Sequence, residues 1–221
     1  GSATVTSVSG LTATQMQTAS NFANFTFTTK AGVTGNNWVM VNTDGTLNGA
    51  GNATGATGPM LSSEYSTTIK TPHQLQLMAM NLAGNYTLGR DINAATTALS
   101  TDVWNGATFV PVGTSTAAPF TGTLDGAGHV ISGLVVNRPG TNYAGLFGAT
   151  SDSAIVRSIG LEGGSITGKN ATGALIGNNL GLVSGSYSTA SVTGGTQVGG
   201  LVGTNGILSG TPGVISNSYA S

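Results

Sequence analysis

Short apolar segments bounded by glycine recur through the C-terminal half of the chain at steps of 26–32 residues. One series is centred on Leu146, Leu175 and Leu201. A second contains Ile166 and Val192, with an earlier, looser copy at residues 131–134. A third lies at residues 155–159, 183–187 and 215–219. Each repeat unit holds three pieces of about three to six residues in which apolar and small polar residues alternate, as in half-buried strands. A unit of this size cannot bury its apolar face alone, so equivalent units must stack on one another.

The repeats predict an all-β fold, a right-handed parallel β-helix with three strands in each coil. Parallel strands stacked about 4.8 Å apart enclose a continuous ladder of Ile, Leu and Val. Gly and Asn between the pieces supply the positive φ angles that sharp turns need. A β-propeller fits less well, because its blades contain longer strands and about 40 residues each.

The N-terminal half lacks this repeat and carries helix signals instead. Thr71 is followed by Pro72 and then Gln74, an order typical of a helix start, and it predicts a helix over 72–82. Thr12 and Gln15 have the spacing of a capping box, which predicts a second short helix. We therefore expect an irregular N-terminal region with one or two short helices that covers the open end of the β-helix.

These signals divide the chain into four expected parts. Residues 1–2 are expected to remain from cloning, and residues 3–70 to form a connecting or capping region with short strands and a short helix. Residues 71–119 are expected to hold the 72–82 helix and the strands that lead into the β-helix. Residues 120–221 are expected to form the β-helix repeats, truncated at the C-terminus, so that the last coil has an exposed edge.

Charged side chains are scarce, with six basic and seven acidic residues among 221, and none follows Lys169. Without a basic patch we expect no nucleic-acid binding. The chain has no Cys, which excludes disulfides and thiolate metal sites, and its apolar run at 75–80 is too short for membrane insertion. Most catalytic sites need several ionisable groups in one cleft, so we expect no enzyme activity, no metal and no cofactor.

Three ionisable residues are nevertheless candidates for chemistry. Asp125 and His129 could form an acid–base pair or half of a metal site, although Asp-Gly is also typical of a tight turn capped by the Asp side chain. Asp91 is interpreted as a buried turn cap, and His73 as a structural residue in the first turn of its helix. An alternative hypothesis, a carbohydrate-active enzyme, predicts that Asp91, Asp125 and His129 meet in one groove.

Hydroxyl side chains also repeat at the spacing of one strand face. The pairs are Thr121 and Thr123, then residues 165 and 167, then residues 191 and 193. If the coils align, these hydroxyls form a ladder on one face. Such a ladder would suit ice binding only if every coil carried it on the same face.

Several short motifs follow one another in a characteristic order from residue 74 onward. They are Gln-Leu-Gln-Leu (74–77), Gly-Asn-Tyr-Thr-Leu (84–88), Arg-Asp-Ile-Asn (90–93), Phe-Val-Pro-Val-Gly (109–113), Phe-Thr-Gly-Thr-Leu-Asp-Gly-Ala-Gly-His-Val-Ile (120–131), Gly-Leu-Phe-Gly (145–148), Gly-Gly-Leu-Val-Gly (199–203) and Asn-Ser-Tyr-Ala (217–220). This order resembles the GLUG-repeat modules of large bacterial surface proteins. These include filamentous-haemagglutinin-type exoproteins of two-partner secretion systems and the repeat regions of some secreted IgA-type proteases. The sequence departs from the pattern at Ala174, where the other copies have Gly145 and Gly200.

The resemblance implies a right-handed β-helical segment of an adhesin that is secreted to the bacterial cell surface. Its role would be attachment to cells, glycans or abiotic surfaces, as in a biofilm, or that of a rigid spacer. The expected partners are a host or environmental surface, including glycans, and neighbouring repeats of the parent chain, with the fragment itself monomeric. Sugar contacts are expected from exposed aromatic rings, with Trp38, Trp104 and Tyr143 as candidates. The alternatives are a polysaccharide-active β-helix enzyme and an accessory region of a secreted protease.

Overall fold

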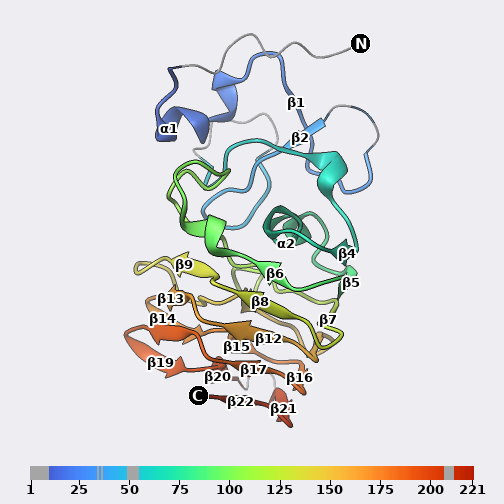
Figure 1. Ribbon diagram of the computed structural model, residues 1–221, viewed down its shortest axis with the longest axis vertical. Coiled ribbons are helices and arrows are strands. Elements are labelled where there is room, and N and C mark those ends of the chain that lie inside the picture. Colours follow the sequence, from blue (N-terminus) through green and yellow to red (C-terminus); the bar gives the residue numbers. More distant parts are fainter. Residues whose placement is uncertain (1–9, 34, 36, 49–54, 207–211) are drawn as a thin grey trace.

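The C-terminal two thirds of the chain wind into stacked coils whose strands pair in parallel (Figure 1). The structure, a computed structural model, describes residues 10–33, 35, 37–48, 55–206 and 212–221. The expectation for residues 1–2 lies outside these residues. The predicted all-β fold, a parallel β-helix with short helices near the N-terminus, is confirmed.

A complete coil contains five short strands, rather than the three that were expected. One such coil consists of β11 (Ile155–Arg157), β12 (Gly160–Glu162), β13 (Ser165–Thr167), β14 (Asn170–Gly173) and β15 (Ile176–Asn179). The sequence pattern placed residues 155–159 in one strand-like piece, but β11 ends at Arg157 and the chain turns before β12 begins at Gly160. Ser158 makes that turn with a φ of 53°, a conformation more often taken by glycine.

The next coil repeats all five strands, whereas the coil before it has only an isolated bridge, from Ala144 to Thr172, beside β14. The coils before it contain β4 (Thr68–Ile69), β5 (Asn85–Leu88), β6 (Ile92–Asn93), β7 (Thr123–Asp125), β8 (Val130–Ser132), β9 (Val135–Asn137) and β10 (Phe147–Ala149). The coils after it contain β16 (Leu182–Ser184), β17 (Tyr187–Ser188), β18 (Ser191–Thr193), β19 (Thr196–Gly199), β20 (Val202–Asn205), β21 (Val214–Ser216) and β22 (Tyr219–Ala220). In the longest sheet the strand order is β4, β5, β7, β11, β16, β21, so the stack begins at Thr68 and not at residue 120.

The register of the strands tests the predicted repeats. Ile166 pairs with Val192, 26 residues on, as expected. The earlier copy of this element was predicted at residues 131–134, which is wrong, because Val136 pairs with Ile166. Ile131 pairs instead with Leu161 in the neighbouring sheet. The strands β8 and β9 resemble each other in sequence because each places one apolar residue inside the stack. The chain turns between them at Gly133.

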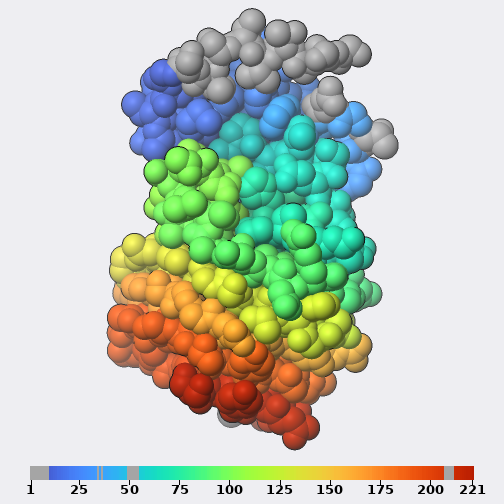
Figure 2. All heavy atoms as spheres, in the orientation of Figure 1, coloured from blue at the N-terminus to red at the C-terminus, as the bar shows by residue number. Residues whose placement is uncertain are grey.

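The core of the stack is a set of aliphatic ladders. Leu146 and Leu175 are fully buried at equivalent places in successive coils, and Leu201 in the next coil is 7% exposed. Gly173 lets two coils approach closely at this corner, because a Cβ there would lie 2.5 Å from the Gly203 amide nitrogen of the next coil. The coils form successive bands across the molecular surface (Figure 2).

The N-terminal region is irregular, as predicted. It contains α1 (Ala13–Met16), η1 (Ala19–Asn21), β1 (Thr26–Phe27), β2 (Asn37–Val39), β3 (Met60–Leu61) and η2 (Ser62–Glu64), followed by α2 (Pro72–Leu77), η3 (Met78–Met80) and, later, η4 (Ala95–Ala98). The capping box at the start of α1 is confirmed, since Thr12 Oγ1 accepts a hydrogen bond from the Gln15 amide. In the small sheet of this region, β2 pairs in parallel with β1 and antiparallel with β3.

The α2–η3 segment closes the N-terminal end of the β-helix. Thr71 caps α2 as predicted, but the α-helix ends at Leu77, and residues 78–80 continue as a 3₁₀ turn rather than reaching residue 82. Leu75 and Met78 pack into the β-helix core, whereas Leu77 packs into a second cluster with the N-terminal region. Both sides of the segment are therefore buried, and it joins the two regions.

The opposite end carries the exposed edge that the sequence predicted. In the last coil Val214 is 54% and Tyr219 is 60% exposed, and Ile215 is 40% exposed. Each of these residues stands in register with a residue of the coil before it.

Candidate functional site

Trp104 is not an exposed ligand contact, and its prediction as one is wrong. The side chain is fully buried, and its indole N–H donates a hydrogen bond of 2.9 Å to Gln76 Oε1. Gln76 lies in α2 and also binds the backbone of Val110 through its side chain. Trp104 therefore anchors the 99–110 segment onto the helix, which sequence spacing could not reveal because the two residues are 28 positions apart.

Trp38 and Tyr143 are both partly exposed, and their role as sugar contacts stays a prediction. Trp38 lies in β2, and one face of its ring stacks on Phe25 with 4.3 Å between ring centroids. Tyr143 lies on the β-helix, at a turn where its φ is 61°. The two rings belong to different regions, so they do not form one site together with Trp104.

The structure brings together two of the three residues of the enzyme hypothesis. Asp91 Oδ1 lies 3.1 Å from His129 Nδ1 and accepts a hydrogen bond from the Val130 amide. Asp125 pairs instead with Arg157 at 2.8 Å and caps its own turn by accepting from the Ala127 amide. The Ala127 amide and the Arg157 guanidinium hold the pKa of the Asp125 carboxyl below its usual value. The prediction that Asp125 caps a turn is confirmed.

The expectation that Asp91 is buried is wrong. Its side chain is 76% exposed, and the Val130 amide, followed by His129, holds its pKa below the usual value. Asp91 therefore links two coils at the surface, because it accepts a hydrogen bond from the Val130 amide in the next coil. The side chain of Asp125 is bound to Arg157 and the Ala127 amide, so the three residues of the enzyme hypothesis do not form one hydrogen-bonded group.

His73 forms the most strongly coupled charge cluster of the described residues. Its Nδ1 lies 2.9 Å from Glu64 Oε2 and its Nε2 lies 2.7 Å from Asp102 Oδ1. These contacts, above all the hydrogen bond to Glu64, raise the pKa of His73 to about 9. Burial alone would raise the pKa of Asp102, but the hydrogen bonds from His73 and the Val103 amide lower it overall.

Both ring nitrogens of His73 are thus hydrogen-bonded to carboxylates. The cluster joins η2, α2 and the 99–106 segment, which confirms a structural role for His73. Its partners lie 9 and 29 residues away, so no local sequence pattern predicted them. Within the described ranges, no group of three or more His, Cys, Asp and Glu side chains could hold a metal ion.

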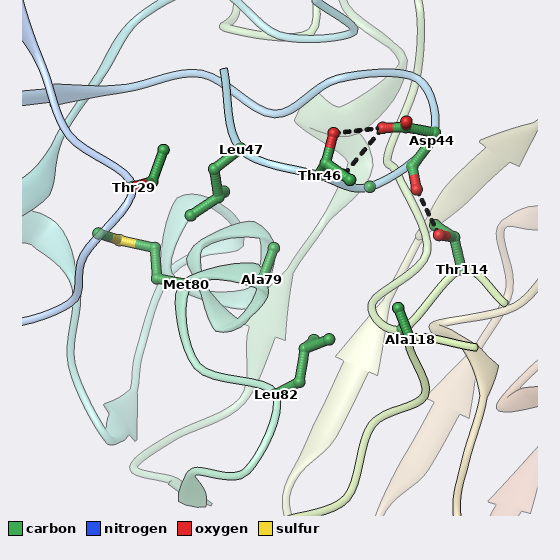
Figure 3. Close-up of a pocket in the computed structure, with 11 residues that line it drawn as sticks. Thr29, Asp44, Thr46, Leu47, Ala79, Met80, Leu82, Thr114 and Ala118 are labelled. Atoms are coloured by element: carbon green, nitrogen blue, oxygen red, sulfur yellow. Dashed lines mark hydrogen bonds between the residues drawn. The ribbon is translucent and has the colours of Figure 1, made fainter. Parts of the chain in front are cut away.

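A groove of about 350 Å³ lies where the N-terminal region meets the β-helix (Figure 3). It is lined by Thr29, Asp44, Gly45, Thr46, Leu47, Ala79, Met80, Leu82, Gly113, Thr114 and Ala118. The walls come from the hairpin closed by Val41 and Leu47, from η3, and from the 113–118 loop. No sequence pattern predicted this groove, because its walls come from segments far apart in the chain, and the Asp44-Gly45 turn is their one local signal.

Two rows of uncharged polar side chains run across the outer surface of the coils. Ser165 pairs with Ser191 and Thr167 with Thr193, so these four hydroxyls form the aligned row, which we call the hydroxyl ladder. The preceding coil has Val135 and Asn137 in these places, and Thr123 lies in a different sheet, so the ladder is not present on every coil.

A second row is hydrogen-bonded from coil to coil. Asn170 Nδ2 donates to Asn142 Oδ1 at 3.2 Å, and Thr196 Oγ1 donates to Asn170 Oδ1 at 2.7 Å. Near the last coil, the rings of Tyr187 and Tyr219 stack with 5.4 Å between centroids and 10° between planes. Both rows show that the outer surface continues the register of the core.

Two proteins are similar to parts of this chain. Over 119 residues, 53% of the chain, it is 39% identical to Halomucin of Haloquadratum walsbyi, and the match covers 1% of that protein. An alignment of 129 positions, which covers 43% of the chain, shows 33% identity to a protein of Evansella cellulosilytica described as a Gly-rich membrane protein, and it covers 15% of that protein. No family model matches the chain, and no solved structure matches it. The chain therefore spans only a small part of each of these relatives.

Proposed function

We propose that this chain is a segment of a large secreted surface protein, in which it acts in attachment or as a rigid spacer. The observation that carries the proposal is the unbroken register of stacked coils with uncharged outer rows. Each coil adds about 4.8 Å of length and is hydrogen-bonded to its neighbours, which resists bending. The hydroxyl ladder offers hydrogen bonds to a glycan or an abiotic surface at positions fixed by the core.

The relatives support a place in a large surface protein. Halomucin is about a hundred times longer than the matched segment, as its 1% coverage requires, and the second relative is named as a membrane protein. In the part of the chain that the structure describes, no helix is long and apolar enough to cross a membrane. On the order of its motifs we further propose membership of the GLUG-repeat modules, with secretion to the bacterial cell surface by a two-partner route.

The alternative of a polysaccharide-active enzyme is less well supported by the geometry. It required Asp91, Asp125 and His129 in one groove, and Asp125 is bound to Arg157 instead. We therefore propose a non-enzymatic role, with neighbouring repeats of the parent chain and an external surface as partners. No contact in the structure favours an accessory role in a protease over this one.

Charging the hydroxyl ladder is expected to weaken attachment. The wild-type chain should adsorb to a neutral polysaccharide film with little dependence on salt, because its ladder carries no charge. The double variant Thr167→Lys/Thr193→Lys should adsorb about tenfold less, because two ammonium groups would lose water at the contact. Adsorbed mass on a quartz crystal microbalance measures both effects.

The matched control is Ser184→Lys/Ser216→Lys, which adds the same charge to an in-register pair on another sheet. Circular dichroism checks that both variants fold. Adsorption of the control should equal that of the wild type. Equal losses in the two variants, or no adsorption of the wild type, would contradict attachment through the ladder.

A further inference from the structure

We propose that the groove between the N-terminal region and the β-helix binds a single neutral sugar ring. The inference rests on the proposed role in attachment and assigns a second, separate contact to it. The side chains of Leu47, Met80 and Leu82 face a shared space, with Ala79 beside them (Figure 3). A volume of about 350 Å³ is at the small end of the range for ligand pockets, which suits one ring rather than an oligosaccharide.

Around Asp44, Thr46 and Thr114, the polar edge of the groove consists of hydrogen-bond acceptors. The Thr46 hydroxyl donates its hydrogen to Asp44 Oδ1 at 2.6 Å and accepts from Asn42 Nδ2 at 3.0 Å. The Thr114 hydroxyl donates its hydrogen to the Asp44 carbonyl oxygen. Because a hydroxyl has one hydrogen, both groups have only lone pairs left to offer, and the Asp44 carboxylate also only accepts. A ligand that binds to these three residues must therefore bring the donors, while the Thr29 hydroxyl, which also lines the groove, can donate or accept.

The charge of the groove narrows the class of ligand further. Asp44 is the one ionisable residue among those that line the groove, so a phosphate, a sulfate or an acidic sugar would meet a negative charge with no cation to balance it. A neutral sugar ring has several hydroxyl donors on its edge and an apolar C–H face for Leu47, Met80 and Leu82. An amine ligand would also bring hydrogen-bond donors and would form an ion pair with Asp44. Asp44 is exposed, however, and a single ion pair in solvent contributes little to the free energy of binding.

The groove is held in shape before any ligand binds. Gly45 adopts a φ of 80°, and a Cβ there would lie 2.5 Å from Thr114 Cγ2, so the hairpin and the 113–118 loop touch at this point. The Thr114 hydrogen bond to Asp44 ties the same two walls together. A preformed site loses less conformational entropy on binding, so a ligand that makes few contacts can still bind to it.

The test is an NMR titration of the ¹⁵N-labelled chain with methyl β-glucoside, methyl β-galactoside and methyl N-acetyl-β-glucosaminide, each followed to about 50 mM. At least one glycoside should give saturable shifts of the Gly45, Thr46 and Ala79 amides, with a Kd of about 1–20 mM. Sodium sulfate and n-butylammonium chloride should leave these amides unshifted. The full chain is used, because the groove needs both regions.

Two matched variants locate the site. Ala118 is exposed and lines the groove, whereas Ala117 is exposed and does not line it. Ala118→Leu should weaken binding about tenfold by filling the groove, and Ala117→Leu should leave the Kd unchanged. Asp44→Asn keeps an acceptor oxygen beside Thr46, so a sugar should lose only a few-fold in affinity.

The sugar proposal is overturned if no glycoside saturates, if the shifts lie elsewhere, or if the two alanine variants behave alike. Saturable shifts with n-butylammonium that Asp44→Asn abolishes would also overturn it, and would assign the groove to a basic side chain of a partner. Failure here is distinguishable from failure of the attachment role. The hydroxyl ladder variants test attachment on a surface and do not alter the groove.

Discussion

Asn179→Ala is expected to lower the free energy of unfolding by about 3 kcal/mol, because it leaves several buried polar groups without partners. Asn179 is fully buried, and its Oδ1 accepts from Thr150 Oγ1 and from the Gly181 amide. Its Nδ2 donates to the Gly181 carbonyl oxygen and to Asn205 Oδ1. Urea unfolding followed by circular dichroism measures the change.

The next coil supplies a matched control for this substitution. Asn205 is in register with Asn179 but is exposed, so water can replace the hydrogen bonds lost in Asn205→Ala. The cost of that variant should be below about 1 kcal/mol. Equal costs at the two positions would contradict the view that Asn179 completes a polar ladder inside the stack.

His73→Gln is expected to remove stability at neutral pH and very little at high pH. The folded chain raises the pKa of His73 from 6.5 to about 9, so its contribution is fully present below pH 6.5 and is lost as the pH rises through 9. The shift corresponds to at most about 3 kcal/mol, and because the three side chains are 20–35% exposed we expect about 1–2 kcal/mol. Glu64 and Asp102 have lowered pKa values, so their contribution is lost instead as the pH falls through the acid range.

Urea unfolding of the wild type and of His73→Gln at pH 6, 8 and 10 measures this effect. The quantity compared is the difference between their free energies of unfolding, in which the titration of the other side chains cancels. The difference should be largest at pH 6 and smallest at pH 10. His129→Gln is the control, because the pair that His129 forms with Asp91 lies on the surface and contributes little. A difference that grows with pH would contradict a stabilising role for the cluster of His73, Glu64 and Asp102.

The sequence predicted the stack of coils well, because the ladders repeat where the core requires an apolar residue. It could not predict that Ser158 makes a turn, because a positive φ at a non-glycine residue leaves no mark in composition. The hydrogen bond that holds the buried Trp104 and the contact of His73 with Asp102 join residues 28 and 29 positions apart. The groove was missed for the same reason, since its walls meet only in the folded chain.

The interpretation of Asp125 was correct because a turn cap is a local feature, formed with an amide two residues away. The burial of Asp91 was wrongly expected because the residue it caps, Val130, lies in another coil. Local hydrogen bonds and repeat spacing could therefore be predicted from this sequence, and contacts between unlike segments could not.

Disulfide trapping tests the register of the stack most directly, because the chain has no cysteine of its own. Thr167 and Thr193 are in register on adjacent strands, so Thr167→Cys/Thr193→Cys places two cysteines about 4.8 Å apart, within the range that a disulfide spans. In Thr167→Cys/Ser191→Cys the pair is two residues out of register and roughly 8 Å apart, which is too far. Intact mass after mild oxidation should show loss of two hydrogens in the first variant and no change in the second. Oxidation of the second pair in preference to the first would contradict the register. It would also contradict the conclusion that the chain is a stack of coils.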